Sequence, residues 1–156
     1  MASNYKPVGG VESCALYPAE AVQTALFSSE GCQATLSGMP VAVMLLDDAS
    51  HYEEVVESCD GITKISHRLS LVADRGDAAP WLDVDFLERA SIEGLVAVVG
   101  LANGRSVLVG YSLHFGSEQP LRLQSMTSAS GSKLHDTPTV TLLLTSCDTE
   151  FSCEMN

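Results

Sequence analysis

The chain has 156 residues, of which 46% are hydrophobic and 18% are charged, and its formal net charge is −12. This length predicts a single domain over residues 1–156, and the balance of apolar and charged residues excludes a disordered chain. The negative charge repels the phosphate backbone of nucleic acids, so we expect no sequence-specific binding of DNA or RNA.

The first ten residues lack the apolar core of a secretory signal. The longest apolar runs, residues 40–46 and 94–102, are far shorter than the roughly 20 residues that cross a bilayer. We therefore expect no membrane partner and a protein that is cytoplasmic when synthesised. Five cysteines without a Cys-x-x-Cys pair predict reduced, mostly buried thiols and no zinc site.

The N-terminal third predicts a mobile arm, two short helices and two strands. Residues 1–13 are polar and contain glycine, and we expect them to be the arm. Pro18 and the helical spacing that follows it predict a helix over residues 18–30. Residues 32–37 alternate weakly as strands do, and the wholly apolar run 41–46 predicts a strand covered on both faces.

Ser50-His-Tyr-Glu53 fits the capping-box pattern and predicts a second helix over residues 51–59. The acids of this segment would form the outer face of that helix. Paired carboxylates can hold a metal ion, but we favour a solvated helix face. These acids are Glu53, Glu54, Glu57 and Asp60.

Asp60-Gly61 predicts a turn, and residues 64–73 then alternate as a strand does. His67 falls on the apolar face of that strand, where we expect a hydrogen-bonded core histidine rather than a catalyst or metal ligand. Residues 80–90 predict one or two helical turns. They include the only tryptophan, Trp81, which we expect to anchor in the core or in an interface.

Residues 92–112 predict a β-hairpin at the centre of the fold. Asn103-Gly104 favours a two-residue type I′ turn, and in that register Val99 faces Leu108. The first strand is apolar on both faces, so both faces must be covered. The second cover could be a helix, another sheet or a neighbouring subunit.

The C-terminal third predicts two further strands. Residues 120–126 alternate, and residues 127–133 form a Ser/Gly-rich connector that we expect to be mobile. Residues 137–147 predict the last strand, with Val140, Leu142 and Leu144 facing inward, and residues 148–156 form an acidic tail. The whole pattern predicts an α+β fold, mainly an antiparallel β-sandwich or barrel with one to three short helices.

The sequence has no phosphate-binding loop, no dinucleotide fingerprint and no zinc-protease motif. Residues 110–114 begin like a nucleophile elbow but have His114 where the second glycine belongs, and residues 130–133 match Ser-x-x-Lys without its companion motifs. A nucleophilic triad could be written from Ser128 or Ser130 with the loop residues His114, His135 and Asp136, but almost any loop-rich chain allows such a combination, so we do not expect one. We therefore expect no enzyme, no cofactor and no metal.

Several short strings in the second half of the chain resemble small uncharacterised proteins of prophage regions and, more loosely, subunits of phage tail tubes. The resemblance extends over residues 40–150. It implies an antiparallel β-sandwich or barrel with a flanking helix that assembles into rings, and it supplies no catalytic residue. The strings are Glu93-Gly-Leu-Val-Ala, Asn103-Gly-Arg, Leu108-Val-Gly110, Gln119-Pro-Leu-Arg-Leu123 and Asp136-Thr-Pro-Thr-Val-Thr-Leu142.

Together these features predict a non-enzymatic phage or prophage virion subunit of the tail type. Its partners would be copies of itself in a ring or other virion proteins, and its final location would be the virion. The alternative is a small β-rich binding module of unknown ligand, with Trp81 and Tyr111 as contacts. The residues expected at an interface or ligand contact are Trp81, Asn103, Gly104, Arg105 and Tyr111.

Overall fold

The computed structural model describes residues 10–28, 31–38, 40–43, 45, 50–74, 83–101, 104–113, 116, 118–129, 139–148 and 153–155. The side chains of Cys59, Asp74 and Ala129 are not among the described parts. Most of these residues form strands, and every strand pair within a sheet is antiparallel. The α+β, mainly antiparallel prediction is therefore confirmed.

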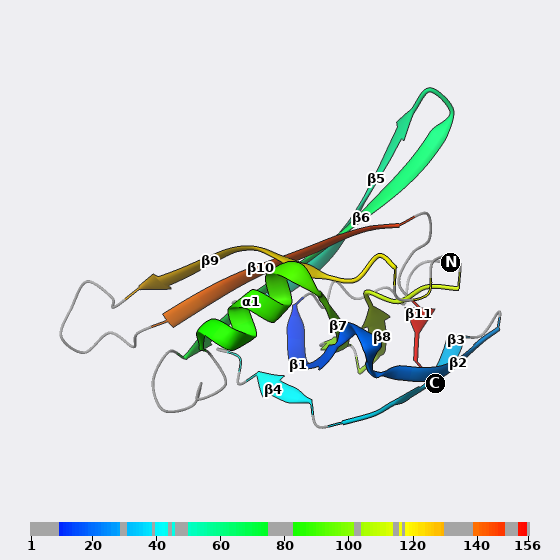
Figure 1. Ribbon diagram of the computed structural model, residues 1–156. Coiled ribbons are helices and arrows are strands. Elements are labelled where there is room, and N and C mark those ends of the chain that lie inside the picture. The colour runs from blue at the N-terminus through cyan, green and yellow to red at the C-terminus, as the bar shows by residue number, and fades with distance from the viewer. Residues whose placement is uncertain are drawn as a thin grey trace.

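The strands form three sheets (Figure 1). A five-stranded sheet has the order β11 (Cys153–Glu154), β8 (Ser106–Val109), β7 (Leu95–Leu101), β1 (Val11–Pro18) and β4 (Val41–Val43). A four-stranded sheet has the order β5 (His51–Cys59), β6 (Ile62–Asp74), β10 (Thr139–Asp148) and β9 (Arg122–Ala129). The third is the hairpin of β2 (Val22–Ser28) and β3 (Gly31–Leu36).

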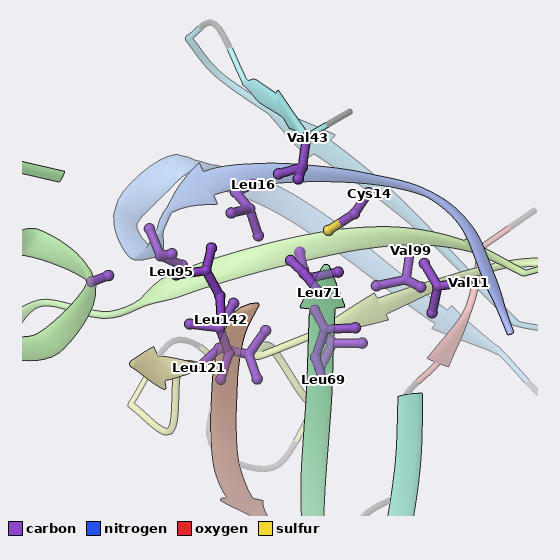
Figure 2. Close-up of a cluster of buried hydrophobic side chains, with 14 of the residues drawn as sticks. Val11, Cys14, Leu16, Val43, Leu69, Leu71, Leu95, Val99, Leu121 and Leu142 are labelled. Atoms are coloured by element: carbon purple, nitrogen blue, oxygen red, sulfur yellow. The ribbon is translucent and has the colours of Figure 1, made fainter. Parts of the chain in front are cut away.

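The main hydrophobic core lies between the two larger sheets. Figure 2 shows Leu69, Leu71 and Leu142 of the four-stranded sheet pointing toward side chains of β1 and β7, and the strands of the two sheets run across one another. The inward residues predicted for the last strand, Val140, Leu142 and Leu144, are at most 1% exposed. Strict alternation in β6 and β10 therefore predicted their buried face correctly.

The α-helix α1 (Val84–Ile92) closes one end of this core through Ala90 and Phe86. Asp83 caps its first turn, because the carboxylate accepts a hydrogen bond of 2.8 Å from the amide of Phe86. The helix predicted at residues 80–90 is thus present, a few residues later than predicted. Trp81 lies outside the described residues.

A second, smaller core covers the other face of the five-stranded sheet. Val96 and Leu108 are fully buried there, beneath Cys32 and the rest of the β2–β3 hairpin. β7 is therefore covered on both faces, as its apolar pattern predicted. The second cover is another sheet of the same chain, so β7 does not need a neighbouring subunit.

The β7–β8 hairpin is present, but its predicted register is wrong by one residue. Val99 faces Val107, and Val98 faces Leu108. The amide of Leu101 donates to the carbonyl of Arg105 at 2.7 Å, and Gly104 has a φ of +88°. The connection is therefore a three-residue loop with a glycine in the left-handed region, rather than a two-residue type I′ turn.

The helix predicted over residues 51–59 is wrong, because this segment is strand β5. Asp60 and Gly61 both have positive φ, 53° and 79°, and form the two-residue turn that pairs β5 with β6 from Cys59↔Ile62 onward. The Ser50 hydroxyl accepts a hydrogen bond of 2.9 Å from the amide of Val72 instead of capping a helix. Glu53 and Glu54 consequently point to opposite faces of a sheet.

The helix predicted over residues 18–30 is also wrong. β1 continues to Pro18, residues Ala19–Ala21 form one 3-10 turn, and β2 begins at Val22. β2 pairs with β3, and this pairing satisfies the backbone groups on one side of the strand. In this arrangement Val22 and Phe27 pack against the second core. A short helix with a weak apolar stripe would not cover that core as a sheet does.

Both ends of the described chain belong to the five-stranded sheet. Residues 11–13, predicted as part of a mobile arm, begin β1, an inner strand; residues 1–9 lie outside the described part. The acidic tail supplies β11, an edge strand. In the described part of the apolar run 41–46, Val41–Val43 form the short edge strand β4 and Leu45 bridges Ala73; Ala42 is exposed, so the prediction of cover on both faces is wrong there.

The connector predicted at residues 127–133 begins inside β9, which continues to Ala129, and the rest of it lies outside the described residues. Leu95 and Leu121 join the two large sheets by a bridge of two backbone hydrogen bonds, 2.7 and 2.9 Å long. This bridge gives the sandwich a partly closed, barrel-like edge.

Candidate functional site

Among the contact residues predicted from the sequence, those that the structure describes fall in two adjoining features, a cleft and the second core. Trp81 and Asn103 lie outside the described residues. Gly104 and Arg105 line an open cleft of about 420 Å³ beside β11. Tyr111 lies in the second core, where its ring stacks on Phe27 with centroids 6.3 Å apart. Its role there is packing, and two members of that core, Val98 and Met155, also line the cleft.

The cleft beside β11 is bordered by an ion pair between Arg105 Nη1 and Glu154 Oε1, 2.9 Å apart. Both side chains are more than half exposed. Water and salt screen such a pair, and its net contribution to stability is typically below about 1 kcal/mol. The cleft therefore offers one cationic and one anionic group that a polar ligand could reach.

The most prominent surface feature is the outer part of the β5–β6 hairpin, which we call the extension and define as residues 56–64. It projects away from the rest of the fold (Figure 1). Every described side chain in it is exposed, including those of Val56 at 52% and Ile62 at 71%. These two β-branched residues lie on opposite faces of the hairpin, because Val56 pairs with Ile65 and Ile62 pairs with Cys59.

The two edges of the four-stranded sheet differ in charge. β5 contains Glu53, Glu54 and Glu57 and neither lysine nor arginine, and the residues opposite these acids on β6 are Arg68, His67 and Lys64. β9 contains one charged residue, Arg122, and otherwise mainly serine, threonine and glutamine side chains. Among the described residues no strand pairs with the outer side of β5 or β9. Such open edges expose rows of backbone donors and acceptors.

His67 lies in a buried polar row on the inner face of the same sheet. It is 4% exposed, and its Nδ1 shares a hydrogen bond of 2.7 Å with the hydroxyl of Tyr52. Glu54 Oε2 lies 3.8 Å from the same nitrogen, and Ser146 faces His67 on β10. The prediction of a hydrogen-bonded core histidine is confirmed.

None of the described cavities is lined by His67, while His114 and His135 lie outside the described residues. Within the same described part of the chain, no cluster of three or more His, Cys, Asp or Glu side chains could hold a metal ion. The part of the chain that the structure describes also has no helix long and apolar enough to cross a membrane.

Sequence reasoning missed the open edges because it assigned residues 51–59 to a helix. One signal could have revealed β5: Asp60-Gly61 is a strong two-residue hairpin signal, and it lies between a segment rich in Tyr and Val and the clearly alternating β6. The capping-box pattern at Ser50 outweighed that signal. The open edge of β9 depends on the strand order, which local pattern does not report.

No protein-family model, no curated protein and no solved structure matches this chain.

Proposed function

We propose that this chain is a non-enzymatic structural subunit that assembles head to tail, with the β5 edge of one copy adding to the β9 edge of the next. The observation that supports this proposal is the pair of open edges at opposite sides of one four-stranded sheet. The two strands have similar lengths, nine residues for β5 and eight for β9. Each strand could therefore pair with the other along most of its length.

The directions of the strands suit this addition. Neighbouring strands in the sheet are antiparallel throughout, so β5 and β9 run in opposite directions. A second copy in the same orientation would place its β5 antiparallel to β9 and continue the pattern, the more stable arrangement per residue. A head-to-tail contact of this kind closes into a ring if its rotation allows, and otherwise forms a filament.

The side chains at the two edges are compatible. Thr127 and Ser125 of β9 lie opposite Thr141 and Leu143, on the outer face of the sheet, and both are exposed. Glu53 and Glu57 of β5 lie on the same outer face, because they alternate with the inward Tyr52 and its neighbours. Acids from one copy would thus meet an edge without acids on the next.

The beginning of β9 is less open than its end. Arg122 Nε lies 3.5 Å from the carbonyl of Ile92 at the end of α1, and the pairing with β10 shifts between Leu143 and Leu144. The accessible part of β9 therefore begins at Ser125. A bulge at the entry to an edge also limits uncontrolled pairing, which suits a contact of defined length.

We assign the subunit to the virion of a phage or prophage, as a tail-type component. The support is the resemblance of residues 40–150 to prophage proteins and tail-tube subunits, together with a mainly β fold and a net charge of −12. A ring with an acidic lumen would let DNA pass without binding it. Genes for tail, capsid or portal proteins beside its own are the expected genomic context, and their absence would remove this assignment while leaving self-assembly open to test.

An alternative is a small binding module, and the cleft at Gly104 and Arg105 favours it. An anionic ligand there would have to displace Glu154 from Arg105. The Arg105→Ala variant would then lose ligand binding but keep its oligomeric state, which distinguishes a binding module from a structural subunit.

The experiment that tests assembly is sedimentation velocity over a range of protein concentrations, for the wild type and two variants of one exposed residue. Thr127→Glu places an acid beside the acidic β5 edge of the next copy, and we expect it to weaken association about tenfold, or about 1.4 kcal/mol. Thr127→Lys is the matched control and should associate at least as well as the wild type.

Restoration of assembly by a second change makes the test specific. Glu57→Lys combined with Thr127→Glu replaces an acid of β5 by a base that can attract the new acid of β9, and should recover association. Circular dichroism establishes that each variant is folded. A wild type that stays monomeric at every concentration, or a Thr127→Glu variant that assembles as well as the wild type, would refute the β5–β9 contact.

A further inference from the structure

Two cysteines that are far apart in the sequence, Cys32 on β3 and Cys153 on β11, meet in the second core. Met155 at the end of β11 forms a parallel bridge with Cys32. Cys32 is fully buried, and the half-buried Cys153 packs against the same cluster. Both are free thiols, and the interaction with Cys153 contributes to the raised pKa of Cys32. Their sulfur atoms are therefore neighbours already in the reduced protein.

The strand that contains Cys153 is held by few interactions. β11 has two residues, and its pairs with β8 are Cys153↔Leu108 and Glu154↔Val107. One further backbone hydrogen bond of 2.8 Å joins Met155 to Ser106. The short length and the exposed Arg105–Glu154 ion pair leave this strand among the parts of the fold that open most easily.

We propose that Cys32 and Cys153 form a reversible disulfide that fastens the C-terminal strand β11 to the β2–β3 hairpin when the protein meets a low-molecular-weight disulfide. Bond formation brings the two sulfur atoms to a separation of about 2.05 Å. Because Cys32 and Cys153 are 121 positions apart in the sequence, the link restricts the unfolded chain strongly, and it prevents β11 from separating.

The reaction is two successive thiol–disulfide exchanges. The Cys153 thiolate attacks one sulfur of the small disulfide, that S–S bond breaks, and a small thiolate leaves. The Cys32 thiolate then attacks Cys153 Sγ, the mixed S–S bond breaks, and the second small thiolate takes up the proton that Cys32 lost. The two protein thiols are oxidised by two electrons, and the small disulfide is reduced to two thiols.

The order of the two steps follows from the surroundings of each thiol. Burial, together with the hydrogen bond and the charge of Cys153, raises the pKa of Cys32 to about 12. Cys32 is therefore protonated at neutral pH and reacts second, whereas Cys153 is the thiol that solvent can reach. The second exchange limits the rate, which should rise with pH.

The test is to incubate the folded full-length chain with oxidised glutathione, block the remaining thiols by alkylation and map the peptides without reduction. Cleavage after acidic residues places each of the five cysteines in a separate peptide. The expected product is one cross-linked peptide pair containing Cys32 and Cys153, lighter than the two separate thiol peptides by two hydrogen masses. Reduction should restore both thiols.

Cys147 is exposed and provides the matched control. The Cys147→Ser variant should form the link at the wild-type rate, and the Cys153→Ser variant should leave Cys32 as a free thiol. Hydrogen exchange at residues 153–155 should slow about tenfold in the oxidised wild type. Glutathione that remains attached to Cys153 beside a free Cys32, or a cross-link to any other cysteine, would overturn the proposal.

Discussion

Gly110 provides the sharpest test of how the two large sheets meet. It is buried directly after β8 and has a φ of +98°. A Cβ atom at this position would lie 2.8 Å from the carbonyl oxygen of Leu95 and 3.1 Å from the amide nitrogen of Leu121. These two backbone atoms belong to the residues that bridge the sheets. The Gly110→Ala variant should therefore strain the junction itself.

The expected loss has two parts. A side chain in the left-handed region costs about 1–2 kcal/mol, and forcing a methyl group against backbone atoms that cannot rotate away costs about 1–3 kcal/mol. We expect Gly110→Ala to lower the free energy of unfolding by about 2–5 kcal/mol. With a slope of about 2 kcal/mol per molar urea, the midpoint falls by roughly 1–2.5 M.

Gly104 separates the two contributions. It has a similar φ of +88°, but a Cβ atom there would meet no atom within 4 Å. Gly104→Ala should therefore cost only the conformational part, about 1–2 kcal/mol. Urea unfolding followed by circular dichroism compares the two variants directly. Equal midpoints for Gly110→Ala and Gly104→Ala would refute the close approach of backbone at the sheet junction.

Three further variants or measurements test other parts of the fold. Asp83→Ala removes the cap of α1 and should lower the stability to urea by about 1 kcal/mol; an unchanged midpoint would contradict the cap. Tyr52→Phe removes the hydrogen bond to His67 and should cost about 1–2 kcal/mol in the same assay, whereas a neutral or stabilising result would mean that the pair contributes nothing. Burial raises the pKa of the Cys14 thiol from 9.0 to about 12, so the unfolded chain loses this proton first and the stability from this group falls as pH rises above about 9. A thiol reagent followed by mass spectrometry should label the exposed Cys147 at once and Cys14 only on unfolding, and equal rates would contradict this burial.

Much of the fold could be predicted where the sequence pattern is long and has one interpretation. Alternation over β6 and β10 identified both strands and their buried faces, including the position of His67. The apolar pattern of residues 95–101 predicted a strand that is covered on both faces, and β7 is that strand. The predictions for β6 and β10 hold because a long run of period two turns one face to the core whatever the partner strand is, and the prediction for β7 holds because a strand that is apolar on both faces must be covered on both.

Short segments with mixed patterns were decided only by tertiary structure. Residues 18–30 and 51–59 contain both helical spacing and β-forming residues, and pairing with β3 and β6 selected the strand in each case. The register of the β7–β8 hairpin followed from a three-residue loop, since the side-chain pattern of β7 is apolar on both faces and therefore tolerates a shift of one residue.

The candidate functional surfaces were also decided by the tertiary structure. Arg105 and Gly104 were predicted as contacts and do line a cleft, but Tyr111 packs inside the second core. The open edges of β5 and β9 and the meeting of Cys32 with Cys153 depend on which strands become neighbours. The sequence by itself determined which residues are buried in long strands. Only the tertiary structure decided the neighbours, because pairing between distant segments is fixed by the backbone hydrogen bonds and packing of the whole fold rather than by local pattern.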